Sequence, residues 1–106
     1  TYAYKRAFLA FMKDIDILLC PVTATPARLH GTTMNHIDDC TYVMMSNLTG
    51  APAVSINCGF STEGLPIGLQ IIAKPWQDHV ALAFAKNTQK ILGIPKIVNP
   101  MPLPNL

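Results

Sequence analysis

The segment between residues 50 and 73 constrains the fold of this chain more than any other part. Gly50 and Pro52 mark the end of a preceding helix, because glycine readily adopts the left-handed conformation of a helix C-cap and proline cannot continue the helix. Two apolar runs follow, at residues 53–60 and 67–73, and a polar Ser-Thr-Glu-Gly sequence separates them. Two such runs joined by a short polar reversal are typical of an antiparallel β-hairpin. The sequence therefore predicts a helix that leads directly into a hairpin.

The residues before this segment predict a helix, a strand and a loop. Apolar side chains recur at helical spacing over residues 2–14, so one face of a helix there should be buried. The members of that face are Tyr4, Phe8, Phe11, Met12 and Ile15. Residues 16–22 form a short apolar run without strict alternation, which predicts a strand buried on both faces. Residues 23–38 carry Thr, Pro, Gly, Asn and His without periodicity and predict a loop.

Two further helices are expected. Asp38 and Asp39 should cap a short helix that ends at Gly50. Asp78 should cap a final helix, which a following glycine and proline would terminate. The buried face of that final helix is expected to consist of Val80, Phe84 and Ile91.

The elements then follow the order helix, strand, helix, strand, strand, helix, which defines an α/β fold class. A chain of 106 residues forms one domain at most. We expect residues 1–94 to belong to that unit and residues 95–106 to form a proline-rich C-terminal tail, since four prolines exclude regular helix and central strand there.

The composition indicates that this chain packs against something larger. Only 13% of its residues are charged, whereas an ordinary soluble domain has about 25%. So few charged residues cannot cover the surface of a small body. The chain also begins on a helical pattern without an initiating methionine or a capping residue. We therefore expect much of its surface to be interior in a larger protein.

Charge and hydropathy argue against nucleic-acid and membrane partners. The net charge is only +2 and the basic residues are scattered, so no basic patch for nucleic acid is visible. No apolar run approaches the roughly 18 residues of a membrane span, and no signal peptide is recognisable. Cys20, Cys40 and Cys58 lack CxxC spacing, which favours reduced thiols and a cytoplasmic or otherwise reducing compartment.

The serines form no recognisable catalytic motif. Ser46, Ser55 and Ser61 begin no Ser-x-x-Lys motif, and no Gly-x-Ser-x-Gly elbow is present. We expect no nucleophile here and interpret Ser46 as bonding its local backbone. One polar stretch is a candidate metal site, because it contains His30, His36, Asp38, Asp39 and Cys40. Their spacing matches no usual ligand pattern, so we interpret them as loop and cap residues and expect no metal or cofactor.

Several side chains are candidates for a binding pocket. The large apolar ones are Tyr42, Met44, Met45 and Trp76, and plain core packing explains each of them equally well. Asn47 stands at a helix end before Leu-Thr-Gly, where its side chain could either clamp the backbone of the following turn or bind a substrate. The sequence favours the clamp.

Two blocks of the chain match a known signature. Asn47-Leu48-Thr49-Gly50-Ala51-Pro52-Ala53 follows the pattern Asn-Leu-x-Gly-x-Pro-Ala, and Gly64-Leu65-Pro66-Ile67-Gly68-Leu69-Gln70 follows Gly-Leu-Pro-x-Gly-x-Gln. Both resemble the C-terminal signature of the amidase signature family of amide hydrolases. The run from Asp16 to Thr23 resembles the family's strand that ends in proline, and Pro75-Trp76-Gln77 resembles its fatty-acid amide hydrolase branch. Asn57 departs from the family, since many members carry proline there, which leaves the end of that strand open.

This resemblance implies a fold and an activity. The fold is the C-terminal portion of a mixed β-sheet covered by helices. The activity is hydrolysis of carboxylic amides through an acyl-enzyme, by a serine, a second serine in a cis peptide and a lysine that all lie upstream of this chain. No catalytic residue maps onto these residues, so the chain alone is expected to be inactive. The residues expected to bind substrate are Tyr42, Met45, Asn47 and Trp76, and of these only Trp76 is supported by the resemblance.

The resemblance also implies partners. These are a small-molecule amide substrate and the rest of the amidase domain, with a homodimer of the parent left open. Two alternatives remain beside the amide hydrolase. One is a non-catalytic interaction module built on the amidase scaffold, and the other is the ammonia-producing subunit of an amidotransferase that acts on misacylated tRNA.

Overall fold

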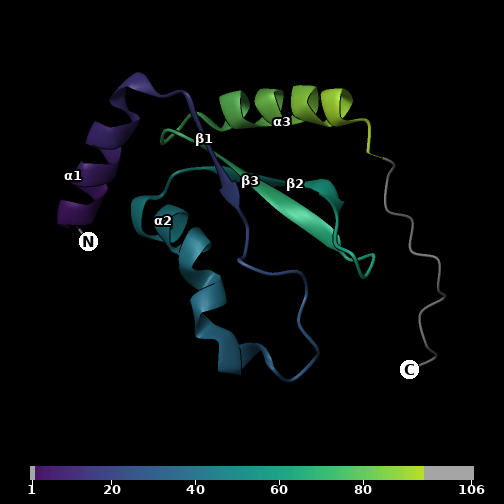
Figure 1. The fold of residues 1–106 in the computed structure, drawn as a ribbon. Helices are drawn as coiled ribbons and strands as arrows, with labels where there is room; N and C mark the ends of the chain where they lie inside the picture. Colours follow the sequence, from purple (N-terminus) through teal and green to yellow (C-terminus); the bar gives the residue numbers. More distant parts are fainter. Residues whose placement is uncertain (1, 95–106) are drawn as a thin grey trace, which may run out of the picture.

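The computed structural model describes residues 2–94, and their elements follow the predicted order (Figure 1). The helices are α1 (Tyr2–Phe11), α2 (Thr41–Thr49) and α3 (Asp78–Leu92), and the strands are β1 (Ile17–Pro21), β2 (Ala53–Phe60) and β3 (Pro66–Ala73). The 3-10 helix η1 (Met12–Asp14) continues α1, and η2 (Thr33–Cys40) leads into α2. The segment η2 replaces the last part of the predicted loop. The tail expected at 95–106 lies outside the described residues.

The described strands form one antiparallel sheet in the order β1-β3-β2. The predicted β2–β3 hairpin is confirmed, and Ser61 closes its turn by donating its N–H to the Leu65 carbonyl at 2.7 Å. The central strand β3 also pairs with β1, from Ile17 opposite Ala73 to Pro21 opposite Leu69. This part of the expected mixed sheet is therefore antiparallel throughout.

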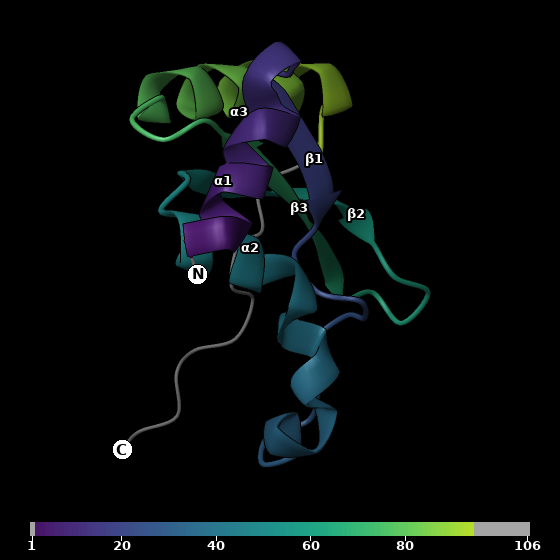
Figure 2. The same ribbon diagram turned by 90° about the vertical axis from the view of Figure 1, so that its left-hand side faces the viewer.

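Helices cover the two faces of this sheet. Successive residues of a strand point to opposite faces, so the neighbours Ile71 and Ile72 are buried in different layers. Ile71 belongs to the layer beneath α3, whereas Ile72 packs with α1 and the end of α2. Figure 1 shows α3 along one side of the strands and α2 on the other, and Figure 2 shows α1 standing beside α2. The molecule is thus a three-layered α/β unit around β3.

The predicted burial of β1 on both faces is wrong for the described residues. Leu19 is 48% exposed, and only β3 pairs with this strand within residues 2–94. The physical reason is the position of α3, which packs over β2 and β3 and leaves β1 largely uncovered. The strand itself is present where it was expected.

The predicted buried face of α3 is also wrong. The helix rests on the sheet through Ala81 and Ala85, which are one turn apart, whereas Ile91 is 84% exposed. Alanine allows the helix backbone to approach the strands closely, so small residues rather than large ones mark this face. In α1 and η1 the expected face is confirmed only in part, because Phe8 and Met12 are buried while Tyr4 and Phe11 are exposed.

The glycine caps were predicted correctly, and the aspartate caps were not. Gly50 and Gly93 end their helices in the left-handed conformation, with φ of 73° and 61°. Asp38 contributes only its carbonyl, which accepts the Thr41 hydroxyl at 2.7 Å. Asp78 lies in the first turn of α3 and makes no side-chain cap hydrogen bond. Its negative charge is still favourable there, because it faces the positive end of the helix dipole.

Asn57 lies at an irregularity of the hairpin. The register of β2 against β3 shifts between Asn57 and Gly59, so Cys58 is an extra residue in a β-bulge. The Asn57 Oδ1 accepts the Gly59 N–H at 3.1 Å and holds the bulge in place. The departure from the family pattern at Asn57 thus coincides with a bend in the strand.

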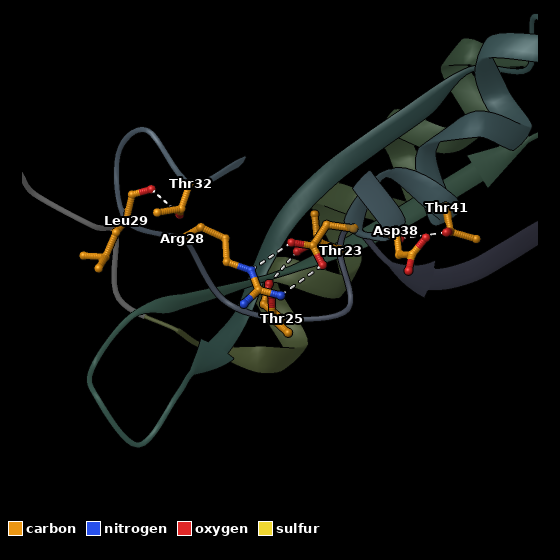
Figure 3. A network of polar contacts seen from close by, with 8 residues as sticks. Thr23, Thr25, Arg28, Leu29, Thr32, Asp38 and Thr41 are labelled. Atoms are coloured by element: carbon orange, nitrogen blue, oxygen red, sulfur yellow. Dashed lines mark hydrogen bonds and ion pairs between the residues drawn. The ribbon is translucent and has the colours of Figure 1, made fainter. Parts of the chain in front are cut away.

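The Asp39 carboxylate pins the long loop that follows β1. Arg28 donates its Nε to Asp39 Oδ2 at 2.9 Å and its Nη2 to Oδ1 at 3.3 Å, a two-pronged ion pair drawn in Figure 3. The hydrogen bond from Arg28 is the main cause that lowers the pKa of Asp39 from its ordinary value, and His36 adds an effect of the same sign. Asp39 therefore fixes the loop to η2 instead of capping α2.

Gly68 is the one described glycine whose missing side chain makes room for a neighbour. A Cβ atom built on Gly68 would stand 2.9 Å from Val22 Cγ2 and 3.3 Å from Ser55 Oγ. The Val22 side chain therefore rests directly on the β3 backbone. The backbone N–H of Val22 also donates to the Gly68 carbonyl at 3.4 Å. This contact explains a glycine in the Gly-Leu-Pro-x-Gly-x-Gln block.

We expect Gly68→Ala to lower the free energy of unfolding by about 1–3 kcal/mol, because the new methyl group overpacks against Val22. Thermal and denaturant unfolding of the purified protein measure the change. Adding Val22→Ala should recover part of the loss, so that the two substitutions are not additive. A full additive loss in the double variant would show that Val22 is not the obstacle.

The Arg28–Asp39 ion pair should weaken in acid. Because the pKa of Asp39 is lower in the folded state than in the unfolded chain, the pair stabilises the loop at neutral pH and is lost as pH falls through that lowered pKa. The Arg28 Nε–H resonance, followed by NMR, should move with an apparent pKa below the usual aspartate value of about 3.9. The titration should disappear in Asp39→Asn, and a midpoint at or above the usual value would contradict the pairing.

Candidate functional site

The structure brings two of the four predicted site residues together. Tyr42 and Met45 lie one turn apart on α2, on the side that faces α1 and β1. Asn47 is exposed near the end of the same helix, and Trp76 lies in the turn between β3 and α3. Neither Asn47 nor Trp76 lines a described cavity with Tyr42 or Met45. The candidate site is therefore centred on α2.

An apolar cavity of about 410 Å³ lies between α1, α2 and β1. Its lining residues are Tyr4, Ala7, Phe8, Phe11, Leu18, Cys20, Tyr42 and Met45. Tyr4 and Phe11 belong to the expected apolar face of the first helix, and both are exposed and border this hollow. No carboxylate, lysine or arginine among the described residues borders it, which suits an apolar group.

A second cavity, of about 460 Å³, lies under the loop that follows β1. Its lining includes Pro21 at the end of β1, loop residues 22–27, Ser55 of β2 and Gly68 of β3. Tyr42 borders this cavity as well as the apolar one and therefore stands between them. Within the loop the Thr23 hydroxyl donates to the Thr25 carbonyl at 2.5 Å, as Figure 3 shows, and the Arg28–Asp39 pair holds its far end.

Gln70 is a positioning residue that sequence reasoning missed. Its side chain is buried in the centre of β3, and its Nε2 donates to the Tyr42 carbonyl at 2.9 Å and to the Cys20 Sγ at 3.2 Å. These bonds attach α2 to the sheet at the residue shared by the two cavities. The sequence feature that could have identified Gln70 is a single amide side chain within an apolar strand. A buried polar side chain almost always has a hydrogen-bond partner, so such a residue is expected to hold another element in place.

The turn after α2 is held by Thr49, so the predicted clamp at Asn47 is wrong. The buried Thr49 hydroxyl donates to the Met45 carbonyl at 2.7 Å and accepts the Ala51 N–H at 3.3 Å. Within residues 2–94 the Asn47 side chain makes no hydrogen bond. An exposed amide without an internal partner stays a candidate for a contact outside the described residues.

Trp76 is 90% exposed, so core packing does not explain it within the described residues. Its φ of 68° is the only positive value among the described non-glycine residues. A residue with a bulky side chain rarely adopts this left-handed backbone conformation, and such backbone strain is usually maintained at functional positions. Trp76 borders a hollow of about 300 Å³ together with Lys5, Thr49, Gly50, Pro52, Pro75 and Asp78.

The serines do not form a catalytic arrangement among the described residues. The Ser61 hydroxyl donates to Glu63 Oε2 at 2.8 Å, and the Lys74 Nζ donates to the Lys13 carbonyl at 3.2 Å. The Ser46 hydroxyl is buried without a partner, so the expected local bond is wrong. No serine in residues 2–94 shares a hydrogen bond with a lysine, which is the pairing that a serine–lysine hydrolase requires.

The described part of the chain offers neither a metal site nor a membrane-spanning helix. Its histidines, cysteines and acids form no group of three that could hold a metal ion, and the polar stretch around His36 is no exception. None of the helices at residues 2–94 combines the length and the apolar character that a membrane crossing requires.

Comparisons with known proteins identify the fold. The "Fatty acid amide hydrolase" of Arabidopsis thaliana is 33% identical over 97 residues, which is 83% of this chain and 16% of that protein. A glutamyl-tRNA(Gln) amidotransferase subunit of Geobacter sp. (strain M21) is 35% identical over 94 residues, or 80% of this chain and 19% of that protein. The chain thus spans less than a fifth of the length of these curated relatives.

A solved structure agrees with these sequence relatives. The crystal structure of the corresponding glutamyl-tRNA(Gln) amidotransferase subunit from Thermotoga maritima superposes with a TM-score of 0.66 at 23% identity, covering 81% of this chain and 20% of that one. The family model described as amidase matches residues 1–82. Since that match spans well over half of the 106 residues, this chain belongs to the amidase family, whose two sequence blocks it carries.

Proposed function

We propose that this chain is the C-terminal part of an amide hydrolase whose catalytic residues precede it. One observation carries the proposal: an amidase match over residues 1–82 occurs in a chain whose described residues hold no serine–lysine pair. The matched segment is less than a fifth of the length of the relatives, which leaves room for a catalytic region elsewhere in them. In this proposal the catalytic residues lie upstream of this chain, and the chain contributes part of the wall of the substrate pocket.

The proposed mechanism is acyl transfer to a serine. A neutral lysine accepts a proton from a bridging serine, which in turn takes the proton of the nucleophilic serine as that oxygen attacks the amide carbonyl. Backbone N–H groups stabilise the oxyanion that forms. The amine leaves with a proton returned through the same chain, and water then hydrolyses the acyl-enzyme. None of these groups is assigned to residues 1–106.

The proposed contribution of this chain is to shape the substrate pocket. Tyr42 and Met45 border the apolar cavity, and the Gln70 bonds keep the Tyr42 backbone in place. We assign the strained, exposed Trp76 and the exposed Asn47 to other parts of the substrate pocket in the parent, since neither lines this cavity. Three free thiols support a cytosolic or otherwise reducing setting for this parent.

An amidotransferase is the second candidate for the parent. It is favoured by the relative and the solved structure that are named as glutamyl-tRNA(Gln) amidotransferase subunits, because the relative matches this chain as well as the fatty acid amide hydrolase does. Such a parent would release ammonia from glutamine for a second reaction. Ammonia release from glutamine, compared with hydrolysis of fatty-acid amides by the same purified parent, separates the two candidates.

We expect the 106-residue chain alone to hydrolyse no amide, because it lacks the nucleophile and its base. Release of a chromophoric amine from an aryl amide measures this, with the full-length parent as the positive control. Turnover by the chain alone that disappears in Ser46→Ala, Ser55→Ala or Ser61→Ala would refute the proposed division. A correctly folded parent that is inactive toward both the aryl amide and glutamine would favour a non-catalytic interaction module.

Trp76→Ala in the parent should impair long-acyl substrates more than short ones, since only the long ones fill the space that the indole covers. The lost contact should cost on the order of 1–3 kcal/mol of transition-state binding for a long acyl amide. The ratio of kcat/KM for a long and a short acyl amide measures the effect, and Trp76→Phe should retain part of it. Ile91→Ala, at an exposed apolar residue on α3, is the matched control. An unchanged ratio would remove Trp76 from the pocket.

A further inference from the structure

The segment that follows β1, residues 22–32, lies over the cavity of about 460 Å³ and has no buried residue of its own. The first six of its residues line that cavity. The hydrogen bonds inside the segment are local, such as the bond from the Thr23 hydroxyl to the Thr25 carbonyl. A segment with so few buried contacts opens at a low free-energy cost.

The Thr25 hydroxyl makes the closed arrangement of this segment less favourable. Its Oγ1 atom is buried and has no hydrogen-bond partner among the described residues. A buried hydroxyl without a partner has given up hydrogen bonds to water, and it regains them when it is exposed. Moving the segment outward would hydrate this oxygen, so the closed arrangement depends on a compensating contact elsewhere.

That contact is the ion pair between Arg28 and Asp39. At the start of the segment the Val22 N–H donates to the Gly68 carbonyl, and the Val22 side chain rests on β3. Beyond Val22, the ion pair is the only hydrogen-bonded contact within residues 2–94 that joins the segment to a residue more than four positions away (Figure 3). The segment is therefore attached at one end by Val22 and near its middle by Arg28.

The ion pair attaches the segment to a part of the fold that is itself fixed to the sheet. Asp39 belongs to η2, which continues directly into α2 and reaches Tyr42 three residues later. The Tyr42 carbonyl accepts the amide of the buried Gln70 at 2.9 Å, so this end of α2 is bonded to the central strand. Tyr42 also borders the cavity. The contact between Arg28 and Asp39 thus holds the segment against the wall of the cavity that it covers.

The ion pair is weak enough to open and close. The Arg28 and Asp39 side chains are 34% and 15% exposed, so water and dissolved salt reach the pair. A pair of this kind favours its bonded arrangement by a factor of about 2 to 5, and salt screens it. Neither residue belongs to the two apolar layers of the core. Breaking the pair should therefore free the segment without unfolding the protein.

We propose that residues 22–32 form a lid on this cavity and that the Arg28–Asp39 ion pair is the latch that keeps the lid closed. Val22 stays in place on Gly68, and the residues beyond it move away from the sheet when the latch breaks. Opening admits molecules to the cavity and to Tyr42, and the open fraction increases with ionic strength. The lining carries no charged side chain, which suits uncharged molecules. The lid is independent of the proposed amide hydrolysis, because all of its groups belong to this chain.

Labelling of a thiol under the lid tests this in the full-length parent. Thr25→Cys puts a sulfur in place of the buried Oγ1 and removes no hydrogen bond, because the Thr25 hydroxyl makes none among the described residues. Iodoacetamide, a small uncharged reagent, should label this thiol about 2- to 5-fold faster when Asp39→Asn breaks the latch. Cys58, a half-buried thiol of β2, is the internal control and should label at the same rate in both backgrounds. Mass spectrometry of the peptides distinguishes the two sites.

Salt and charge exchange test the latch in two further ways. Raising the ionic strength to about 1 M, where the Debye length is about 3 Å, should increase the labelling of Thr25→Cys by the same factor. With Asp39→Asn present, salt should have no effect. Arg28→Asp alone should give fast labelling, because it places two carboxylates together, and adding Asp39→Arg should restore slow labelling.

Three results would overturn the lid. The first is a labelling rate of Thr25→Cys that neither Asp39→Asn nor salt changes. The second is a parallel increase at Cys58, which would indicate general loosening of the fold. The third is fast labelling in the charge-exchanged variant, because the charges would then not be what closes the segment. None of these measurements needs amide hydrolysis, so an inactive parent with salt-dependent labelling would refute the proposed function and leave the lid in place.

Discussion

The burial of β3 on both of its faces is the constraint on which the other elements depend. Ile71 and Ile72 are fully buried in opposite layers, one under α3 and the other against α1 and α2. Burying each such side chain contributes about 1.5–3 kcal/mol, and no helix could be removed without exposing one of them. Gln70, the residue before them, is the polar counterpart, because its amide bonds α2 and β1 from inside the same strand. A single strand thus determines where three helices and two strands lie.

Local signals in the sequence were enough to predict the hairpin, the order of elements and the glycine caps. Each of these depends on residues close together in the chain, such as Gly50 and the proline two positions later. The orientation of α3 could not be predicted, since Ala81 and Ala85 become the buried face only because a sheet lies close beneath them. Likewise Asp39 is a residue type that often caps a helix. Its ion pair with Arg28 forms only because the loop folds back toward η2, which the sequence does not show.

The candidate site was predictable where one helix supplies its residues. Tyr42 and Met45 are three positions apart on α2 and meet the same cavity by helical geometry alone. Gln70 was missed because its importance comes from contacts with Cys20 and Tyr42, which are 50 and 28 positions away. Asn47 was assigned the clamp that Thr49 provides, because both residues precede the same turn and only the structure distinguishes a buried hydroxyl from an exposed amide.

The conformation of Trp76 also gives the protein an optical reporter. It is the only tryptophan of the chain, and its indole is almost fully in contact with water within the described residues. Emission excited at the red edge of absorbance, where the three tyrosines contribute little, therefore originates from the single turn that joins β3 to α3. An indole in water emits at long wavelength and shifts to shorter wavelength when it is covered. The emission wavelength of Trp76 therefore reports whether this turn is covered, by a substrate chain or by another part of the protein.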